Sequence, residues 1–171
     1  FDTAVKREDM RVAIRFNGSS DIAIEAIKCR DGQTILRKYR HLQFMDYTKS
    51  HKRMLRYLSN ELPTNYHLTF SRTESNEHLC RDILSRGGNV AAVFSNGLPF
   101  SFMGHHVING DNHDLRFLDP MGVVVGLTPK GWVAKRDHSA GQRCLVDLRS
   151  GRMLHGQSLD LLSHHHDLVE R

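Results

Sequence analysis

The segment between Gly104 and Asp119 holds the densest group of side chains that can do chemistry. Its sixteen residues include three histidines, three aspartates and one arginine, around an Asn-Gly-Asp turn at residues 109–111. Buried polar groups need hydrogen-bonding partners, so a segment of this composition is poor material for a hydrophobic core. We therefore predict a functional site here.

Metal binding is one chemistry that fits the segment. Histidine and aspartate side chains are common ligands of Zn²⁺, Mn²⁺ and Fe²⁺. The segment supplies six of them: His105, His106, Asp111, His113, Asp114 and Asp119. The order Gly-Asp-x-His-Asp is similar to pieces of the binuclear metallophosphoesterases, although those enzymes carry the pieces on separate strands and have further motifs that this chain lacks. On this hypothesis the cofactor is a divalent metal, the protein is a metal-dependent hydrolase, and the ligands are Asp111, His113 and Asp114. If the site is catalytic, its acid–base candidates are these three residues and Glu74.

A structural role is the alternative for the same segment. Asp111 and Asp114 would cap turns, His113 would donate to a backbone carbonyl, and Arg116 would pair with Asp119. The residues alone do not decide between the two interpretations.

Positive charge is concentrated in residues 28–56. This stretch carries nine Lys or Arg against two Asp, whereas the whole chain has a net charge of only +5. Basic side chains between aromatic ones can follow phosphates and stack on bases, so the stretch predicts nucleic-acid binding; a solvated helix face is the alternative. The predicted phosphate-binding residues are Lys49, Lys52, Arg53, Arg72, Arg116 and Lys130.

Several classes of protein are excluded by missing motifs. The chain has no phosphate-binding Gly-x-x-x-x-Gly-Lys loop, no dinucleotide-binding Gly-x-Gly-x-x-Gly and no Gly-x-Ser-x-Gly nucleophile turn.

Cys29, Cys80 and Cys144 lie far apart, without disulfide or zinc-finger spacing, which favours a reducing cytoplasm. No signal peptide or membrane-spanning run is present, so we expect no membrane association. Because the chain begins at Phe1, we expect a trimmed N-terminus.

The first half of the chain alternates strand and helix patterns. Strands are predicted at residues 11–16, 41–47, 65–71 and 89–94. One helix is predicted over 49–62 after Thr48 as its cap, and a second carries the apolar stripe Leu79, Cys80, Ile83 and Leu84 after a Ser71–Glu74 capping box. This order predicts βα repeats and a parallel sheet over residues 1–96.

The second half, residues 97–171, has the pattern of short strands. They are predicted at 106–109, 115–118, 122–127 and 143–148, with a hairpin at Asn109-Gly110 and a terminal helix over 157–169. The predicted fold is therefore a single α/β domain over residues 1–171, with a partial parallel sheet or incomplete βα barrel and a β-rich C-terminal half.

Polar residues follow the first three predicted strands at the points where these end. They are Asn17 and Ser19, then Asp46, Thr48 and Lys49, then Ser71, Arg72 and Glu74. Because ligands of parallel α/β proteins meet the carboxyl ends of the strands, this edge is the predicted place of the site.

Linked motifs along residues 11–137 resemble those of an uncharacterised family of bacteriophage-encoded proteins. They are Asp46-Tyr47-Thr48-Lys49, Leu68-Thr69-Phe70-Ser71-Arg72-x-Glu74-x-Asn76, Asn89–Phe94, Gly110-Asp111-x-His113-Asp114-x-Arg116-Phe117-x-Asp119-Pro120 and Val125-Gly126-Leu127-x-x-Lys130-Gly131. The resemblance implies a partial α/β-barrel fold and, for a viral protein, the host cytoplasm. It implies no established reaction.

The resulting hypothesis is a phage-type protein that binds or modifies nucleic acid through its basic stretch and its Asp/His/Arg cluster. The alternatives are a non-catalytic protein that binds a host factor, and the metal-dependent hydrolase described above. Whether the chain is an enzyme is left open.

Overall fold

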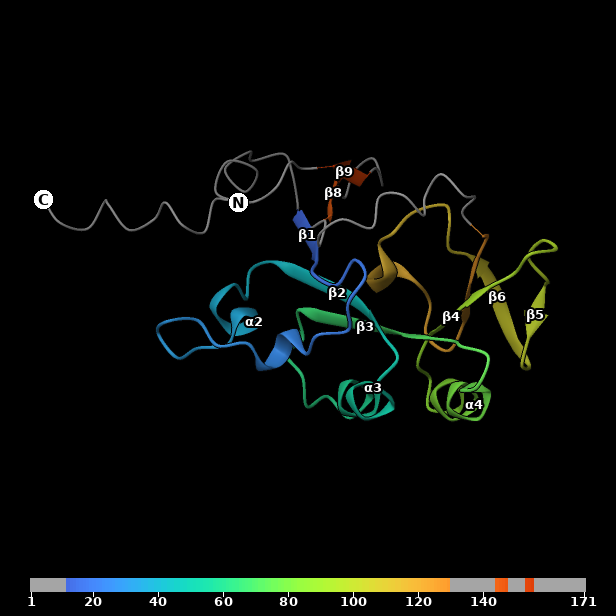
Figure 1. The fold of residues 1–171 in the computed structure, drawn as a ribbon, viewed down its shortest axis with the longest axis horizontal. Helices are drawn as coiled ribbons and strands as arrows, with labels where there is room; N and C mark the ends of the chain where they lie inside the picture. Colours follow the sequence, from blue (N-terminus) through green and yellow to red (C-terminus); the bar gives the residue numbers. More distant parts are fainter. Residues whose placement is uncertain (1–11, 130–143, 148–152, 156–171) are drawn as a thin grey trace, which may run out of the picture.

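An open, mostly parallel sheet forms the centre of the molecule (Figure 1). The computed structural model describes residues 12–129, 144–147 and 153–155. Within these residues nine strands pair in the linear order β5-β6-β7-β4-β3-β2-β1-β8-β9, and they do not close into a barrel. The predicted α/β fold with a partial parallel sheet is therefore confirmed.

The first four strands are joined by crossovers, as the alternating pattern predicts. They are β1 (Val12–Arg15), β2 (Gln43–Thr48), β3 (Tyr66–Ser71) and β4 (Val90–Val93), and each pairs in parallel with the next. Helix α3 (His51–Leu58) connects β2 to β3, and α4 (Glu77–Ser85) connects β3 to β4. The longer connection from β1 to β2 contains the 3₁₀ helix η1 (Ile24–Ala26) and the short α2 (Ile35–Lys38).

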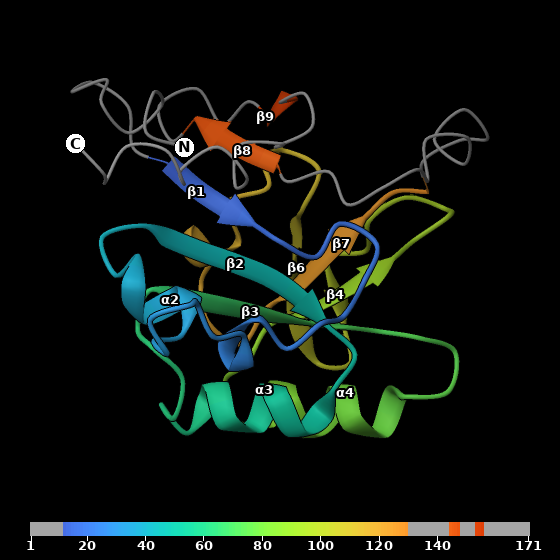
Figure 2. The same cartoon turned by 60° about the vertical axis from the view of Figure 1, so that its left-hand side comes forward.

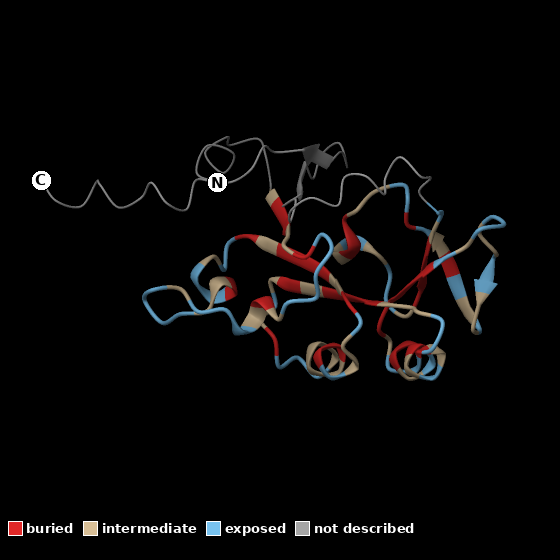
Figure 3. Ribbon diagram, viewed as in Figure 1, coloured by how far each residue is buried: buried red, intermediate tan, exposed pale blue. Residues whose placement is uncertain are grey.

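Helices α3 and α4 lie side by side under one face of the sheet (Figure 2). Alternate residues of β2 and β3, among them Phe44, Leu68 and Phe70, pack against Met54 of α3 and Ile83 of α4. The opposite face carries a smaller cluster of Ala13, Met45, Leu115 and the half-buried Phe117. Burial on both faces explains why the central strands are red along most of their length in Figure 3, as a parallel sheet requires. No helix in the described residues has the length and hydrophobicity to cross a bilayer.

The ends of both long helices differ from the prediction. Helix α3 starts after Ser50, whose side chain accepts from the backbone N–H of Arg53, and Thr48 is instead the last residue of β2. It ends at Leu58 because Asn60 adopts a left-handed conformation with φ 57°. The predicted Ser71–Glu74 capping box is wrong: α4 begins at Glu77, and Asn76 instead holds the preceding turn through Thr73 N–H and the Ser71 carbonyl.

Parallel pairing continues into the second half of the chain. Strand β6 (His105–Asn109) runs parallel to β7 (Val124–Leu127), so Asn109-Gly110 begins a crossover and the predicted hairpin there is wrong. Antiparallel pairing occurs between the short β5 (Ser101–Phe102) and β6, and at β8 (Cys144–Asp147) and β9 (Met153–His155).

Residues 115–118, predicted as a strand, form the 3₁₀ helix η2 (Arg116–Leu118). The coiled backbone lets the Arg116 side chain fold back onto the turn at His113, which an extended strand would not allow. The predicted helix over 157–169 lies outside the described residues.

Gly88 provides a test of the contact between the helices and the sheet. A Cβ at this position would lie 2.7 Å from Ile83 Cγ2 and 3.0 Å from Met54 Cε, so Gly88→Ala overpacks the core. We expect a loss of about 1–3 kcal/mol in the free energy of unfolding, measured by urea denaturation. Ser85→Ala, at an exposed position of α4, is the control and should change it by less than about 0.5 kcal/mol. Equal stability of the two variants would contradict this packing.

Candidate functional site

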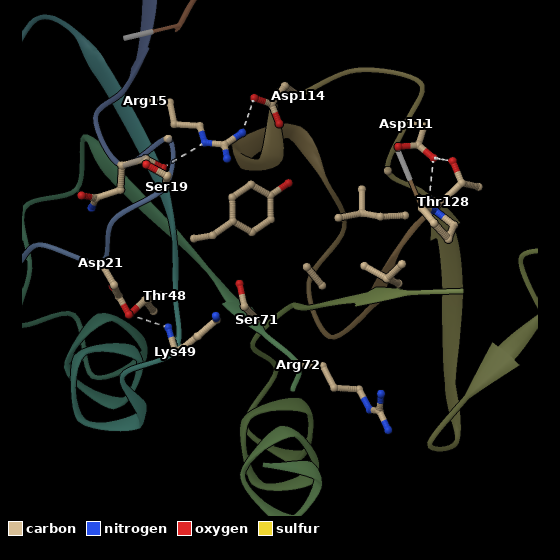
Figure 4. Close-up of a pocket in the computed structure, with 18 of the residues that line it drawn as sticks. Arg15, Ser19, Asp21, Thr48, Lys49, Ser71, Arg72, Asp111, Asp114 and Thr128 are labelled. Carbon is tan, nitrogen blue, oxygen red and sulfur yellow. Dashed lines mark hydrogen bonds and ion pairs between the residues drawn. The ribbon is translucent and has the colours of Figure 1, made fainter. Parts of the chain in front are cut away.

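A cavity of about 840 Å³ opens at the carboxyl ends of the parallel strands (Figure 4). The loop after β1, the ends of β2 and β3, the turn after β6 and the end of β7 contribute its walls, and Ala91 and Val93 of β4 contribute apolar surface. Parallel strands bring these ends to one edge of the sheet. Six of the polar residues that follow the first three predicted strands line the cavity: Asn17, Ser19, Thr48, Lys49, Ser71 and Arg72. Asp46 is buried at 1% exposure, and Glu74 is exposed and not among the lining residues.

The turn between β6 and η2 forms one wall and is built around the buried Arg116. This guanidinium donates to the His113 carbonyl, and its Nη1 lies 3.3 Å from Asp119 Oδ2. The pairing of Arg116 with Asp119, expected from the structural interpretation, is confirmed. Gly110 packs against the guanidinium so closely that a Cβ would lie 3.0 Å from Arg116 Nη1. With 1% of its surface exposed, Arg116 stabilises the turn and is not presented to a phosphate.

Two carboxylates of the turn tie it to neighbouring strands. Asp111 Oδ2 accepts from the backbone N–H and the hydroxyl of Thr128, at 2.8 and 2.7 Å, just after β7. Asp114 Oδ2 accepts from Arg15 Nη1 of β1 at 3.0 Å, and the Arg15 guanidinium lies 4.8 Å from the centre of the Tyr47 ring. Both carboxylates therefore connect elements that are distant in the sequence, which their spacing alone did not predict.

The third residue of the predicted metal set, His113, has its Nδ1 turned toward donors. Leu115 N and Arg116 Nη2 each lie 3.3 Å from this nitrogen. A neutral histidine that binds a metal through Nε2 carries its proton on Nδ1 and donates it to an acceptor. In the part of the chain that the structure describes, the groups that face Nδ1 are donors and no such acceptor is found. Among the described residues, no three His, Cys, Asp or Glu side chains are grouped so that they could hold a metal ion. The metal hypothesis gains no support from this part of the chain.

A second network of buried charges holds the loop after β1. Asp46 accepts from the Asn17 backbone N–H at 2.8 Å, from Asn17 Nδ2 at 3.2 Å and from the Tyr66 hydroxyl at 3.0 Å. Arg53 also donates to the Tyr66 hydroxyl, and it forms ion pairs with Asp21 and Glu25. Arg53, predicted to bind phosphate, is thus a buried structural residue of α3.

Lys49 and Arg72 are the predicted basic residues that line the cavity. Figure 4 shows them on the same side of it, with Ser71 between them and Asp111 and Asp114 opposite. Glu77 forms an ion pair with Arg72 at 3.7 Å from Nη2, which is beyond hydrogen-bond distance. Arg72 Nε has no hydrogen-bond partner among the described residues, and the guanidinium lies 5.5 Å from the centre of the Phe102 ring.

The rest of the basic stretch is not gathered at this cavity. Arg37 and Arg40 line a separate cavity of about 380 Å³ with Asn65, at the amino end of β3. Six residues of β3 separate the two edges, a distance of about 17 Å at 3.3 Å per residue. Lys52 is exposed on α3 without lining either cavity, and Lys130 lies outside the described residues.

Burial shifts the pKa of several groups near the cavity. It raises the pKa of Asp46 to about 6 against the stabilising effect of its donors, and it raises the pKa of Tyr47 to about 12. Burial, with the charge of Arg116, lowers the pKa of His67 to about 4. Tyr47 and His67 are therefore neutral at pH 7, and Tyr47 offers the cavity a protonated hydroxyl.

The buried ion pairs of Arg53 predict that this residue contributes much more to the stability of the fold than Arg56 of the same helix. Arg53→Ala leaves Glu25, whose side chain is 4% exposed, without its partner, so we expect a loss of about 3–5 kcal/mol in the free energy of unfolding. Arg56 pairs with Glu61 at the surface, and Arg56→Ala should cost about 0–1 kcal/mol. Urea denaturation of both variants measures the difference. Similar stabilities would show that the buried pair is not formed.

The raised pKa of Asp46 predicts that the free energy of unfolding depends on pH. The folded protein holds this proton up to about pH 6, whereas the unfolded chain releases it near 3.8, so this group destabilises the fold as pH rises through that window. The size of the effect is on the order of 3 kcal/mol. Asp46→Asn should remove it, so the free energies of unfolding of wild type and variant should converge or cross between pH 4 and 7. Glu74→Gln, at an exposed carboxylate, is the control, and parallel pH profiles of wild type and Asp46→Asn would refute the prediction.

Comparison with known proteins identifies the family of the chain. Neither curated proteins nor solved structures gave a match. A family model described as Gene product 88 matches residues 1–145, which is most of the 171 residues. This agrees with the phage-type family that the sequence motifs resemble. The chain belongs to the Gene product 88 family.

Proposed function

We propose that this protein binds nucleic acid in the cavity at the carboxyl edge of the sheet, and that it takes an unpaired nucleotide there. Lys49 and Arg72 hold backbone phosphates, and the base lies toward the opposite wall. The proposal narrows the predicted phosphate-binding residues to Lys49 and Arg72, which both line this cavity.

One observation carries the proposal: among the described residues, two cations of the cavity wall have no carboxylate at hydrogen-bond distance, and the ion-pair partner of Arg72, Glu77, lies 3.7 Å from its Nη2. Arg15, the third cation of the lining, is held by Asp114 at 3.0 Å. Among the described residues, no carboxylate lies within hydrogen-bond distance of the Lys49 ammonium or the Arg72 guanidinium. A phosphate supplies both the negative charge and the acceptor oxygens, and the planar guanidinium matches it with two parallel N–H groups.

The size and lining of the cavity favour an unpaired nucleotide over a duplex. Its volume of about 840 Å³ is in the range of small-ligand sites, so it can take one or two units of a chain. The apolar side chains of Ala91, Val93 and Leu127 offer a surface for a base, whereas the bases of a duplex are stacked inside and do not reach such a cavity.

The distribution of charge in the cavity wall favours one orientation of the bound nucleotide. Lys49 and Arg72 lie on one side of the cavity, and Asp111 and Asp114 lie on the other (Figure 4). Phosphates are attracted to the first side. On the second side Arg15 and Asp114 neutralise each other and Asp111 carries a negative charge, so this side is less favourable for a phosphate. The hydrogen-bonding edge of a base, which carries no net charge, is the part of a nucleotide that suits the second side.

The salt dependence of binding tests this function. We expect the affinity for a short single-stranded oligonucleotide to fall linearly on a log–log plot against salt, because bound cations release counterions. Lys49→Ala and Arg72→Ala should each make the slope shallower by about 0.7, the value for one phosphate contact in a single strand. Fluorescence anisotropy over a range of salt concentrations gives these slopes.

Arg40→Ala is the matched control for this experiment. It removes the same charge from an exposed position at the amino edge of the sheet, so the net charge changes equally while the cavity contact is kept. Its slope should equal that of the wild type. A flat salt response of the wild type would refute nucleic-acid binding and favour the host-factor alternative. Equal effects of Arg40→Ala and Arg72→Ala would refute the cavity as the place of binding.

A further inference from the structure

His113 lines the cavity, and the environment of its Nδ1 determines which ring nitrogen carries the proton. Leu115 N and Arg116 Nη2 both lie 3.3 Å from Nδ1. A backbone N–H donates, and a guanidinium has only donors. Nδ1 must therefore offer its lone pair, because a proton on this nitrogen would point at two other N–H groups.

The proton of the imidazole is consequently on Nε2. The Nδ1 side of the ring is occupied by the turn, so Nε2 is the nitrogen that remains for a ligand in the cavity. The nearby carboxylates are engaged elsewhere: Asp114 accepts from Arg15, and Asp119 pairs with Arg116. His113 is thus an uncharged donor at the rim of a strongly charged turn.

Arg116 keeps this arrangement in place. Its side chain is 1% exposed, donates to the carbonyl of His113 and packs against Gly110. Its Nη2 donates to this carbonyl and also faces Nδ1, so turning the guanidinium away from Nδ1 would break that hydrogen bond. Arg116 therefore acts as a positioning residue for the ring, although the cavity does not expose it.

We infer that His113 recognises the base of the bound nucleotide, by donating its Nε2–H to an acceptor nitrogen or carbonyl oxygen on the base edge. This inference rests on the proposed function and deepens it. The phosphates belong to the side of Lys49 and Arg72, and the turn that carries His113 lies on the side of Asp111 and Asp114 (Figure 4). A neutral donor suits a base there, because it adds no charge that would compete for phosphate.

The tautomer is measurable on the free protein. Long-range ¹H–¹⁵N correlation spectra of the full chain at pH 7 distinguish protonated from unprotonated imidazole nitrogens, and the signals lost in His113→Asn assign the ring. We expect Nε2 protonated and Nδ1 unprotonated. A proton on Nδ1, alone or on both nitrogens, would overturn the inference irrespective of any ligand.

Two substitutions of His113 distinguish the loss of the Nε2–H donor from a disruption of the turn. In His113→Asn the side-chain oxygen can accept from the backbone N–H two residues on, so the turn is kept while the donor at the ε position is lost. We expect its affinity for a mixed-sequence single strand of about eight nucleotides to fall about two- to tenfold, the effect of one hydrogen bond. The salt slope should not change. His113→Gln, whose amide nitrogen reaches the ε position, should bind more tightly than His113→Asn.

His78→Asn, at an exposed position of α4, is the matched control and should bind as the wild type does. Wild-type affinity in His113→Asn would overturn the role of His113 and leave the proposed function standing. A shallower salt slope in His113→Asn would mean a phosphate contact and overturn the assignment to the base. If the wild type itself does not bind the strand, the proposed function fails and this role fails with it.

Discussion

The buried guanidinium of Arg116 is the feature on which the rest of the candidate site depends. A full positive charge at 1% exposure is tolerated only when carboxylates and carbonyls around it compensate the lost hydration. The His113 carbonyl accepts from Arg116 Nη2, and Asp119 forms an ion pair with Nη1 at 3.3 Å, although Nε and Nη1 have no hydrogen-bond partner among the described residues. Both compensating groups belong to the same short turn. The turn must therefore keep one shape. That shape places Asp111 against Thr128, Asp114 against Arg15 and His113 at the cavity.

A second buried arginine, Arg53, organises the loop after β1, which forms another wall of the cavity. Arg53 holds Asp21 and Glu25, and with Tyr66 it supports Asp46, which in turn holds Asn17 at the end of β1. The two networks use most of the charged groups near the cavity for structure. Lys49 and Arg72 are left out of them, and the proposed phosphate side of the cavity rests on this contrast more than on the total positive charge of the chain.

Much of the fold could be predicted because its signals are local. The strands β1 to β4 and the helices α3 and α4 are each encoded by apolar patterns within about ten residues, and their alternation implies parallel pairing. The failures occur where a local signal was overridden by distant contacts. Asn109-Gly110 favours a hairpin, but β7 pairs in parallel with both β6 and β4, so the chain must cross over instead. Residues 115–118 alternate like a strand, but Arg116 needs the carbonyl of His113.

The sequence by itself determined the α/β class, the edge of the sheet where polar residues gather, and the family of the chain. Only the tertiary structure decided which of the charged residues are scaffold and which face the cavity. Arg53 and Arg72 are the same residue type in similar polar segments, yet one is buried between Asp21 and Glu25 and the other lines the cavity without an acid at hydrogen-bond distance. The physical reason is that a charge takes its role from partners brought together by folding. Asp114 and Arg15 are 99 residues apart in the chain and 3.0 Å apart in space, and no local pattern records such a pair.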